Sequence, residues 1–497
     1  MKILQSLLIF LSVSPAVAQQ GVIPDSVELN ALEKLYQATN GDQWLDNTGW
    51  LTTGDFASWY GVQVLNGDVV GLNLAFNDLD GEIPLELFDL TELQDLTLEF
   101  NLLRGEIDGS INKLKKLRFL YLRQNYLTGI IPAGLGSLTE LRVLDLFNNN
   151  LDGPIPSSLG GLSALVELDL AFNSFSGSIP GDLGNLLNLQ ILNLGDNLLD
   201  GEIPGTLGNL GQLFDLLLDY NSLSGQIPPS FSNLSSLEYF GVSYNKLSGN
   251  LPDFLSTLPI RGFWVYGNDF NSLPSFEGHP DLSSVILDVR ENKLDFGDLE
   301  PIWTPSGSIF SFPYYFPQDS IDTFFNPSDF TFSVEVGGQY NQYQWIKNGI
   351  DIPGAISATF TLDQSEYSEA DVYHCKVTNT LVTGLTLWSE SKPIRAGKYF
   401  AIADGNWNDP IWSREKNGPL TDGLPGEGSE VYIIGKDVTL SQNTTTGPVR
   451  VIVENAGASL TVDGAEMTVY GELELTKETE GYPGNVRVIN GGKIVPR

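Results

Sequence analysis

Apolar residues recur through the middle of the chain in a pattern that changes period within each short unit. In the segment 141–162, Leu144 and Leu146 alternate with polar neighbours, which is the period of a β-strand. An asparagine follows, and Gly153 and Pro156 then bend the chain back. One such unit cannot bury its own leucines, so the pattern predicts that neighbouring units stack and share a core.

The unit recurs with its asparagine in register. The asparagines stand 24 residues apart, except for one gap of 23, at Asn77, Asn101, Asn125, Asn149, Asn173, Asn197, Asn221, Asn245, Asn268 and Asn292. A buried amide at a strand end must find hydrogen-bond partners, and the backbone of adjacent coils can supply them. We therefore predict a solenoid of about ten coils over residues 69–301, with a parallel sheet about 50 Å long at about 4.8 Å per coil.

The consensus LxxLxLxxNxLxGxIPxxLGxL resembles the plant-type leucine-rich repeat of receptor ectodomains, which also occurs in bacterial surface proteins. Units nine and ten, around Asn268 and Asn292, lack the Gly-x-Ile-Pro element, so we expect them to form a terminal transition. The resemblance implies a mainly β leucine-rich-repeat solenoid with short helical or 3-10 segments. It also implies a ligand-binding concave face, by which we mean the outward surface of the strands.

The N-terminus has the features of a signal peptide. Lys2 precedes an apolar stretch, and Ala16-Val-Ala18 fits a small-residue cleavage site. We predict a signal peptide over residues 1–18, cleaved near Ala18. The mature protein would then be secreted or displayed on the extracellular face of the cell surface.

Residues 19–68 resemble the N-terminal cap of the same repeat family. Asp25 to Glu28 reads as a capping box for a helix that ends at about Thr39. Tryptophan motifs follow, and we expect their side chains to pack as core: Trp44, Trp50 and Trp59. Plant receptors usually carry a disulfide cysteine near the place of Val64, so the cap would depend on packed tryptophans instead.

Residues 305–395 change to short alternating runs. Trp345 lies upstream of Tyr373 and Cys375, and this arrangement resembles an immunoglobulin-like sandwich with a core tryptophan and a corner tyrosine two residues before the cysteine. Cys375 is the only cysteine, so no intrachain disulfide can form. We expect its side chain to be a small buried hydrophobe.

Residues 396–497 are rich in Val, Gly, Thr and Asn, and their short apolar runs between turn residues predict a small β-solenoid or a sandwich. The opening segment 405–413 looks similar to a module of large bacterial surface proteins. Two alternatives stay open at Arg497. Either the chain is a fragment of a longer protein, or its last strand pairs with a partner.

One segment of this module has a weak calcium pattern. Asp404, Asn406, Asn408 and Glu415 occupy positions 1, 3, 5 and 12 of an EF-hand-like loop. Position 6 is Asp409 where the turn needs glycine, and no flanking helices are evident. We expect these residues to form turns of the β-module, with calcium binding as the alternative.

The formal charge is −36, from 62 acidic and 26 basic residues. Such a surface repels nucleic acid and anionic membranes. No segment beyond the signal sequence is long and apolar enough to cross a bilayer. A secreted protein without disulfides is more typical of bacteria than of animals or plants.

The chain lacks the common catalytic motifs. Its two histidines, His279 and His374, accompany no nucleophile arrangement, and there is no zinc spacing, Walker loop or Gly-x-Ser-x-Gly. With 62 acidic residues, pairs of carboxylates arise by chance. We therefore predict no catalytic residues and no cofactor, and keep a carboxylate-based hydrolase only as a third hypothesis.

Aromatic and acidic side chains form columns across the predicted strands. The residue before each asparagine is often aromatic, and we expect this column at the rim of the sheet, where its members either pack on one another or bind a ligand: Phe76, Phe100, Phe172, Tyr220 and Tyr244. Two further columns supply the rigid area and polar groups that a binding surface needs. They give the candidate ligand-binding residues Asp95, Phe119, Tyr121, Asp145, Glu167, Asp169, Asp215, Tyr239 and Trp264.

These patterns favour a non-catalytic recognition or adhesion protein that binds a peptide, protein or glycan on its concave face. The second hypothesis is an accessory glycan-binding component of a polysaccharide-degrading system, with aromatics stacking on sugars. The sequence specifies neither the ligand nor the oligomeric state.

Overall fold

A computed structural model of the protein describes residues 26–52, 55–274, 285–304, 307–308, 318–326, 330–363, 371–390 and 392–393, and separate strands between residues 397 and 496. The chain divides into two compact units, residues 1–290 with 310–314, and residues 291–309 with 315–497. The signal peptide predicted over residues 1–18 lies outside the described residues. Among the described residues, no helix has the length and apolar character needed to span a membrane.

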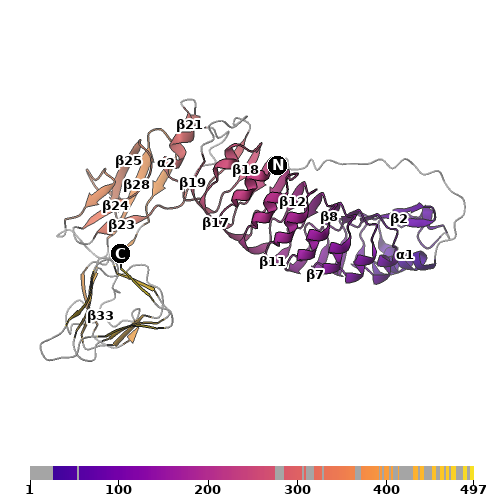
Figure 1. Ribbon diagram of the computed structural model, residues 1–497, viewed down its shortest axis with the longest axis horizontal. Helices are drawn as coiled ribbons and strands as arrows, with labels where there is room; N and C mark the ends of the chain where they lie inside the picture. The colour runs from indigo at the N-terminus through magenta and orange to yellow at the C-terminus, as the bar shows by residue number, and fades with distance from the viewer. Residues whose placement is uncertain are drawn as a thin grey trace. The chain divides into compact units, whose positions relative to one another are not determined.

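The repeats of the first unit form two parallel sheets (Figure 1). The longer sheet, in this order, contains β1 (Val62–Leu65), β2 (Asp68–Asn73), β4 (Asp95–Thr97), β6 (Phe119–Tyr121), β8 (Val143–Asp145), β10 (Glu167–Asp169), β12 (Ile191–Asn193), β14 (Asp215–Leu217), β16 (Tyr239–Gly241), β18 (Gly262–Trp264) and β20 (Ile286–Asp288). Only the β1–β2 pair of this sheet is antiparallel. The predicted solenoid is confirmed.

The return path of each coil supplies the second sheet and a short 3-10 helix. The second sheet contains β3 (Asp80–Glu82), β5 (Leu102–Glu106), β7 (Tyr126–Gly129), β9 (Asn150–Gly153), β11 (Ser174–Ser178), β13 (Leu198–Glu202), β15 (Ser222–Gly225), β17 (Lys246–Asn250) and β19 (Asp269–Ser272). The 3-10 helices are η3 (Leu85–Asp89), η4 (Gly109–Lys113), η5 (Ala133–Ser137), η6 (Ser157–Gly161), η7 (Gly181–Asn185), η8 (Gly205–Asn209), η9 (Pro229–Asn233) and η10 (Asp253–Ser256). Buried leucines fill the space between them.

Each coil turns where the sequence changes period. Gly153 has φ +71°, a left-handed conformation that glycine adopts without a Cβ clash, and it ends β9. Pro156 then caps η6 from an extended conformation. Leu144, Ile155 and Leu159 all lie in the core.

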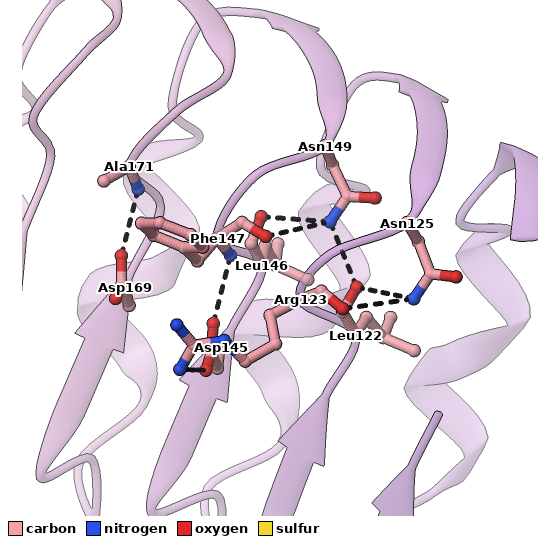
Figure 2. A network of polar contacts seen from close by, with 9 residues as sticks. All are labelled: Leu122, Arg123, Asn125, Asp145, Leu146, Phe147, Asn149, Asp169 and Ala171. Atoms are coloured by element: carbon pink, nitrogen blue, oxygen red, sulfur yellow. Dashed lines mark hydrogen bonds and ion pairs between the residues drawn. The ribbon is translucent and has the colours of Figure 1, made fainter. Parts of the chain in front are cut away.

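The asparagine ladder joins the coils as predicted (Figure 2). The side-chain amide of Asn149 donates to the carbonyl of Leu122 in the preceding coil at 3.0 Å and to that of Leu146 in its own coil at 3.1 Å. Its Oδ1 accepts the N–H of Leu127 at 3.1 Å. The buried amide is therefore satisfied by backbone of two coils, and similar contacts recur from Asn101 to Asn268.

The N-terminal cap begins with α1 (Ser26–Ala38), close to the predicted end of that helix, and continues through η1 (Gly41–Gln43) and η2 (Phe56–Ser58). Trp44, Trp50 and Trp59 are buried and pack on one another with ring centroids 4.8 and 4.9 Å apart, which confirms their expected role as core. Asp25 of the predicted capping box lies outside the described residues. Glu28 accepts the N–H of Val69 at 2.9 Å and so ties the helix to the first coil.

The second unit begins with a short helix and continues as antiparallel sheets. Its elements to residue 393 are α2 (Phe296–Leu299), η12 (Glu300–Ile302), β21 (Trp303–Thr304), β22 (Gly307–Ser308), β23 (Thr323–Asn326), β24 (Thr331–Val334), β25 (Asn341–Lys347), β26 (Ile350–Asp351), β27 (Thr359–Thr361), β28 (Val372–Asn379), β29 (Thr386–Trp388) and β30 (Lys392–Pro393). Trp345 and Tyr373 are core, and Trp345 lies opposite Cys375 in the β25–β28 ladder. Cys375 is buried as expected, and burial raises its thiol pKa to about 11.

Two carboxylates of the helical segment bind a loop of this unit. Asp295 caps α2 and accepts the N–H of Gly337 at 2.6 Å. Glu300 accepts the N–H of Gln339 at 2.8 Å and the amide of Asn379 at 2.6 Å. These bonds attach the helical segment to the loop before β25 and to the end of β28.

The described C-terminal strands are β31 (Gly397–Ala401), β32 (Gly405–Asn406), β33 (Trp412–Ser413), β34 (Ser429–Ile434), β35 (Asp437–Leu440), β36 (Arg450–Glu454), β37 (Ser459–Asp463), β38 (Glu466–Val469), β39 (Glu472–Thr476), β40 (Asn485–Ile489) and β41 (Lys493–Pro496). Their pairings are parallel apart from β31–β33. Each parallel pair joins strands that are two or three elements apart in the chain, and this arrangement favours the solenoid over the sandwich among the two predicted arrangements.

Candidate ligand-binding face

The two predicted columns lie on the longer sheet, and the register brings some of their members together. One column places Asp95 beside Phe119 and Asp215 beside Tyr239. In the other, Tyr121, Asp145 and Asp169 follow one another on β6, β8 and β10. Asp95 and Trp264 lie on β4 and β18, towards opposite ends of the sheet, so the nine candidates do not form one compact site.

Four carboxylates lie in the middle of the face. We call them the acidic patch: Glu167, Asp169, Asp215 and Asp219. Burial, reinforced by the charge of Asp145, raises the pKa of Asp169 to about 7. Burial, with Asp219 and Glu167, raises the pKa of Asp215 to about 7, and burial raises that of Asp219 to about 6. Burial therefore disfavours the ionised form of these carboxyl groups.

The local fold does not need the negative charge of Asp169. Its Oδ1 accepts the N–H of Ala171 at 3.1 Å and closes a turn after the strand (Figure 2). One coil further, Asn193 makes the same bond to the N–H of Gly195 at 3.2 Å. An amide oxygen is therefore sufficient for this turn.

Arg123 supplies the positive charge at one side of this group. Its Nη1 lies 3.1 Å from Oδ2 of Asp145, whose side chain is only 1% exposed (Figure 2). The guanidinium carbon stands 4.8 Å from the ring centroid of Phe147 and 5.9 Å from that of Phe100. Asp145 was predicted as a ligand-binding residue, but the structure places it beneath Arg123.

The remaining acidic and phenolic candidates on β4 and β6 are half-buried. Burial raises the pKa of Asp95, although the Thr97 hydroxyl donates to it at 2.8 Å and partly offsets this effect. Burial, followed by the charge of Glu167 and Asp95, raises the pKa of Tyr121. Tyr121 is therefore a neutral hydrogen-bond donor at physiological pH.

An aromatic patch follows the acidic patch along the sheet and consists of Phe214, Tyr239 and Trp264. Tyr239 packs on Phe214 edge to face at 5.3 Å and lies nearly parallel to Trp264 at 6.3 Å. The Trp264 ring lies over Gly262, where an added Cβ would be 2.4 Å from the indole. Glycine at this place lets the indole lie on the sheet.

The column before the asparagines lies at the rim, as predicted. Phe76 and Phe100 are exposed and stack at 4.1 Å, and Tyr220 and Tyr244 pack at 4.8 Å. Each of these four residues has a positive φ of 48° to 54°. These ring contacts support the interpretation that the column is structural.

Sequence reasoning missed the outward position two residues before each asparagine. It contains Glu99, Arg123, Phe147, Asp219 and Tyr266, and the same leucine alternation that revealed the other columns identifies it. A hollow of about 410 Å³ also adjoins β10 and β12 at their N-terminal ends, where Val166 and Gln190 line it with Arg142 and Asn188. The carboxylates of the acidic patch do not line this hollow.

Several predicted residues have no described environment. His279, Asp404, Asn408 and Glu415 lie outside the described residues, and the side chain of Asn406 in β32 is also outside them. Within the ranges that the structure describes, no group of three or more His, Cys, Asp or Glu side chains could hold a metal ion.

Comparisons with known proteins agree with this geometry. A family described as "Leucine rich repeat" matches residues 91–151, and a second described as "Leucine Rich Repeat" matches residues 164–186, 188–210, 212–234 and 236–258. Both matches lie within the solenoid of the first unit. No curated protein sequence matches the chain.

Solved structures of plant origin resemble the repeat region. The ectodomain of the receptor kinase GASSHO1/SCHENGEN3 from Arabidopsis thaliana, in complex with CASPARIAN STRIP INTEGRITY FACTOR 2, is 33% identical with a TM-score of 0.51, and covers 54% of this chain and 32% of its own. The Arabidopsis HAESA ectodomain, in complex with an IDA peptide hormone ligand, is 32% identical with a TM-score of 0.49, and covers 54% and 45%. A plant ice-binding protein is 28% identical with a TM-score of 0.47, and covers 55% and 89%. This chain thus spans less than half of the two receptor ectodomains.

Proposed function

We propose that this protein is a recognition protein that binds a peptide or protein segment along its concave face and catalyses no reaction. The observation that carries the proposal is the acidic patch beside the aromatic patch on one continuous sheet. Asp169 holds a charge that burial disfavours and that the turn at Ala171 does not need. Residues that reduce stability without a role in the fold are typical of functional surfaces.

The comparisons support this class of function. The GASSHO1/SCHENGEN3 ectodomain was solved with a bound factor, and its repeats share 33% identity with this chain. Aromatic side chains such as Tyr239 and Trp264 provide large rigid contact area, and the carboxylates provide orientation. A bound segment could use both patches because they follow each other on β10 to β18.

The proposal includes the setting in which binding occurs. We propose secretion or surface display of a bacterial type, from the signal sequence over residues 1–18 and the single cysteine. We also propose that the antiparallel sheets between residues 318 and 393 form an immunoglobulin-like domain, because Trp345, Tyr373 and Cys375 form its core. This domain and the C-terminal strands would act as spacers or additional adhesion units.

A peptide library displayed on phage, selected against the full chain, tests the proposal. We expect Trp264→Ala and Tyr239→Ala to weaken the selected peptides at least about tenfold, as for aromatic residues at the centre of an interface. Tyr126→Ala is the matched control, because Tyr126 is exposed on the second sheet. Selected peptides that bind both concave-face variants as well as the unaltered protein would overturn the proposal.

A glycan ligand is the second candidate. The observation that favours it is the Trp264 indole, which lies over Gly262 and nearly parallel to Tyr239. Such a surface can stack on a sugar ring. A glycan array probed in parallel with the peptide library separates the two ligand classes, since glycan binding that is lost in Trp264→Ala would favour this alternative.

A further inference from the structure

We propose that the hollow at the N-terminal ends of β10 and β12 binds a single acidic sugar residue, that is, a sugar ring with one carboxylate. This site is separate from the site of the proposed function, because neither the acidic patch nor the aromatic patch lines the hollow. The inference combines the shape of the hollow, the charge of one side chain in its lining, and two amides that face no partner within the described part of the chain.

The hollow exists because one coil has short side chains where its neighbours have long ones. Val166 takes the place that Arg142 and Gln190 hold in the preceding and following coils, and Ala164 takes the place that Asn188 holds in the following coil. The N–H of Val166 donates to the carbonyl of Arg142, and the N–H of Gln190 to that of Val166, both at 2.8 Å. The backbones of Arg142 and Gln190 are therefore two strand spacings, or about 10 Å, apart on either side of Val166.

The lining combines polar and apolar side chains around a space of about 410 Å³. Arg142 and three amide residues supply the polar atoms, and Ala164, Val166 and Leu187 supply the apolar surface. Openings of about 300–1,000 Å³ with a few polar groups on an apolar wall are typical of small-molecule sites. The hollow therefore has the size and lining that a small polar ligand requires.

Arg142 supplies the charge that selects a carboxylate. No acidic side chain among the described residues pairs with it, whereas Arg104, Arg123, Arg261 and Arg290 each pair with one. A free guanidinium can hold a carboxylate through two parallel hydrogen bonds. Among the described residues that line the hollow, Arg142 alone is charged, so it matches one carboxylate. A polyanion would meet the repulsion of a chain of charge −36.

Gln190 and Gln212 supply the groups that sugar hydroxyls need. Neither side-chain amide bonds to another described residue, whereas the amide of Asn188 donates to the carbonyl of Ser163 at 2.9 Å. An amide both donates and accepts, as a hydroxyl does, so the two free amides suit a ligand with several hydroxyls. The apolar side chains between the polar groups suit the C–H face of a sugar ring.

A peptide C-terminus is the alternative ligand with one carboxylate. Beside its carboxylate it presents one backbone N–H and one side chain, which leaves fewer partners for two amides. Because Gln190 and Gln212 both line the hollow, the structure favours the hydroxyl-rich ligand.

Methyl β-glucuronide and methyl β-glucoside test the inference, since they differ only in a carboxylate or a CH₂OH group on the ring. In a titration of the full chain followed by ligand NMR, we expect a dissociation constant of about 1 mM for the glucuronide and at least about tenfold weaker binding of the glucoside. Arg142→Gln should weaken the glucuronide at least about tenfold and leave the glucoside nearly unchanged. Gln190→Leu should weaken both sugars about threefold to tenfold.

A further variant separates shape from charge. Val166→Arg gives this coil the residue that Arg118 and Arg142 provide in the two preceding coils, so it fits the fold, adds positive charge and fills the hollow. Binding of the glucuronide should therefore be lost. Arg118→Gln is the matched control, because Arg118 stands in the same column but does not line the hollow, and it should change the affinity less than about twofold.

Several results would contradict the inference. They are no binding of the glucuronide, equal binding of the two sugars, stronger binding in Val166→Arg, or equal weakening by Arg118→Gln and Arg142→Gln. Tighter binding of N-acetyl-leucine than of the glucuronide would assign the hollow to a peptide C-terminus instead and would also overturn the inference. Trp264→Ala should leave glucuronide binding unchanged, so this inference and the proposed function fail independently.

Discussion

Replacing Asp169 with asparagine should stabilise the repeat unit at neutral and alkaline pH. Burial raises the pKa of this carboxyl from 3.8 to about 7, so its ionised form is disfavoured in the folded state. A raised pKa contributes stability that is fully present below the ordinary value of 3.8 and is lost as the pH rises through about 7. Asparagine is neutral, so its burial does not incur the cost of desolvating a charge. Asn193 shows that an amide closes the same turn.

The magnitude follows from the difference between the two pKa values. From 3.8 to about 7, at about 1.4 kcal/mol per pH unit, the penalty on the ionised form reaches about 4 kcal/mol. The expected gain for Asp169→Asn is therefore at most about 4 kcal/mol at pH 8, and close to zero near pH 4, where both side chains are neutral.

Urea denaturation at about pH 4, 6 and 8, followed by tryptophan fluorescence, measures this difference. Asp152→Asn is the control, since Asp152 is exposed on the second sheet and should change stability by less than about 0.5 kcal/mol at each pH. The reasoning is refuted if Asp169→Asn destabilises the protein at pH 8, or if its effect is the same at all three pH values. Stabilisation together with loss of ligand would show that the charge is kept for binding.

Three further variants test other parts of the structure. Asn149→Ala removes a buried amide with four hydrogen bonds to backbone and should cost about 2–4 kcal/mol in urea denaturation, whereas the exposed Asn150→Ala should cost far less. Gly241→Ala places a Cβ 2.1 Å from Oδ2 of Asp219 and should weaken a selected peptide, while Gly211→Ala, with open space around its Cβ position, should not. Burial raises the pKa of Glu300, but its hydrogen bonds outweigh burial and hold the pKa below 4.5. This carboxylate therefore contributes stability above pH 4.5 that is lost on acidification. Glu300→Gln should speed amide exchange at Gln339 near pH 7 and reduce that acid dependence.

The repeat architecture could be predicted from the sequence because every coil has the same local sequence pattern. The leucine alternation gave the direction of each outward side chain, and the asparagine spacing gave the register, so Tyr121, Asp145 and Asp169 were correctly placed on adjacent strands. Burial could not be predicted in the same way. Asp145 is covered by Arg123 from a different coil, and that contact depends on side-chain conformations that no period reveals.

The second unit shows the same limit for contacts that are distant in sequence. Alternation identified Trp345 and Tyr373 as core residues, and both are buried. The bonds from Asp295 to Gly337 and from Glu300 to Gln339 join residues that are 42 and 39 positions apart, and no repeat or periodicity links them. Only the folded chain brings these carboxylates to that loop.

The constant coil length makes the distance between two groups in space independent of their large separation along the chain. Neighbouring groups on the concave face are 24 residues apart along the chain, as Asp145 and Asp169 are, yet about 4.8 Å apart in space. Duplicating or excising one coil between Asp215 and Trp264 would therefore move Trp264 relative to Asp215 by one step of that size, without disturbing the asparagine contacts on either side. A lineage carrying this gene could change ligand spacing by recombination between repeats, in discrete increments, while each individual contact stays as it is.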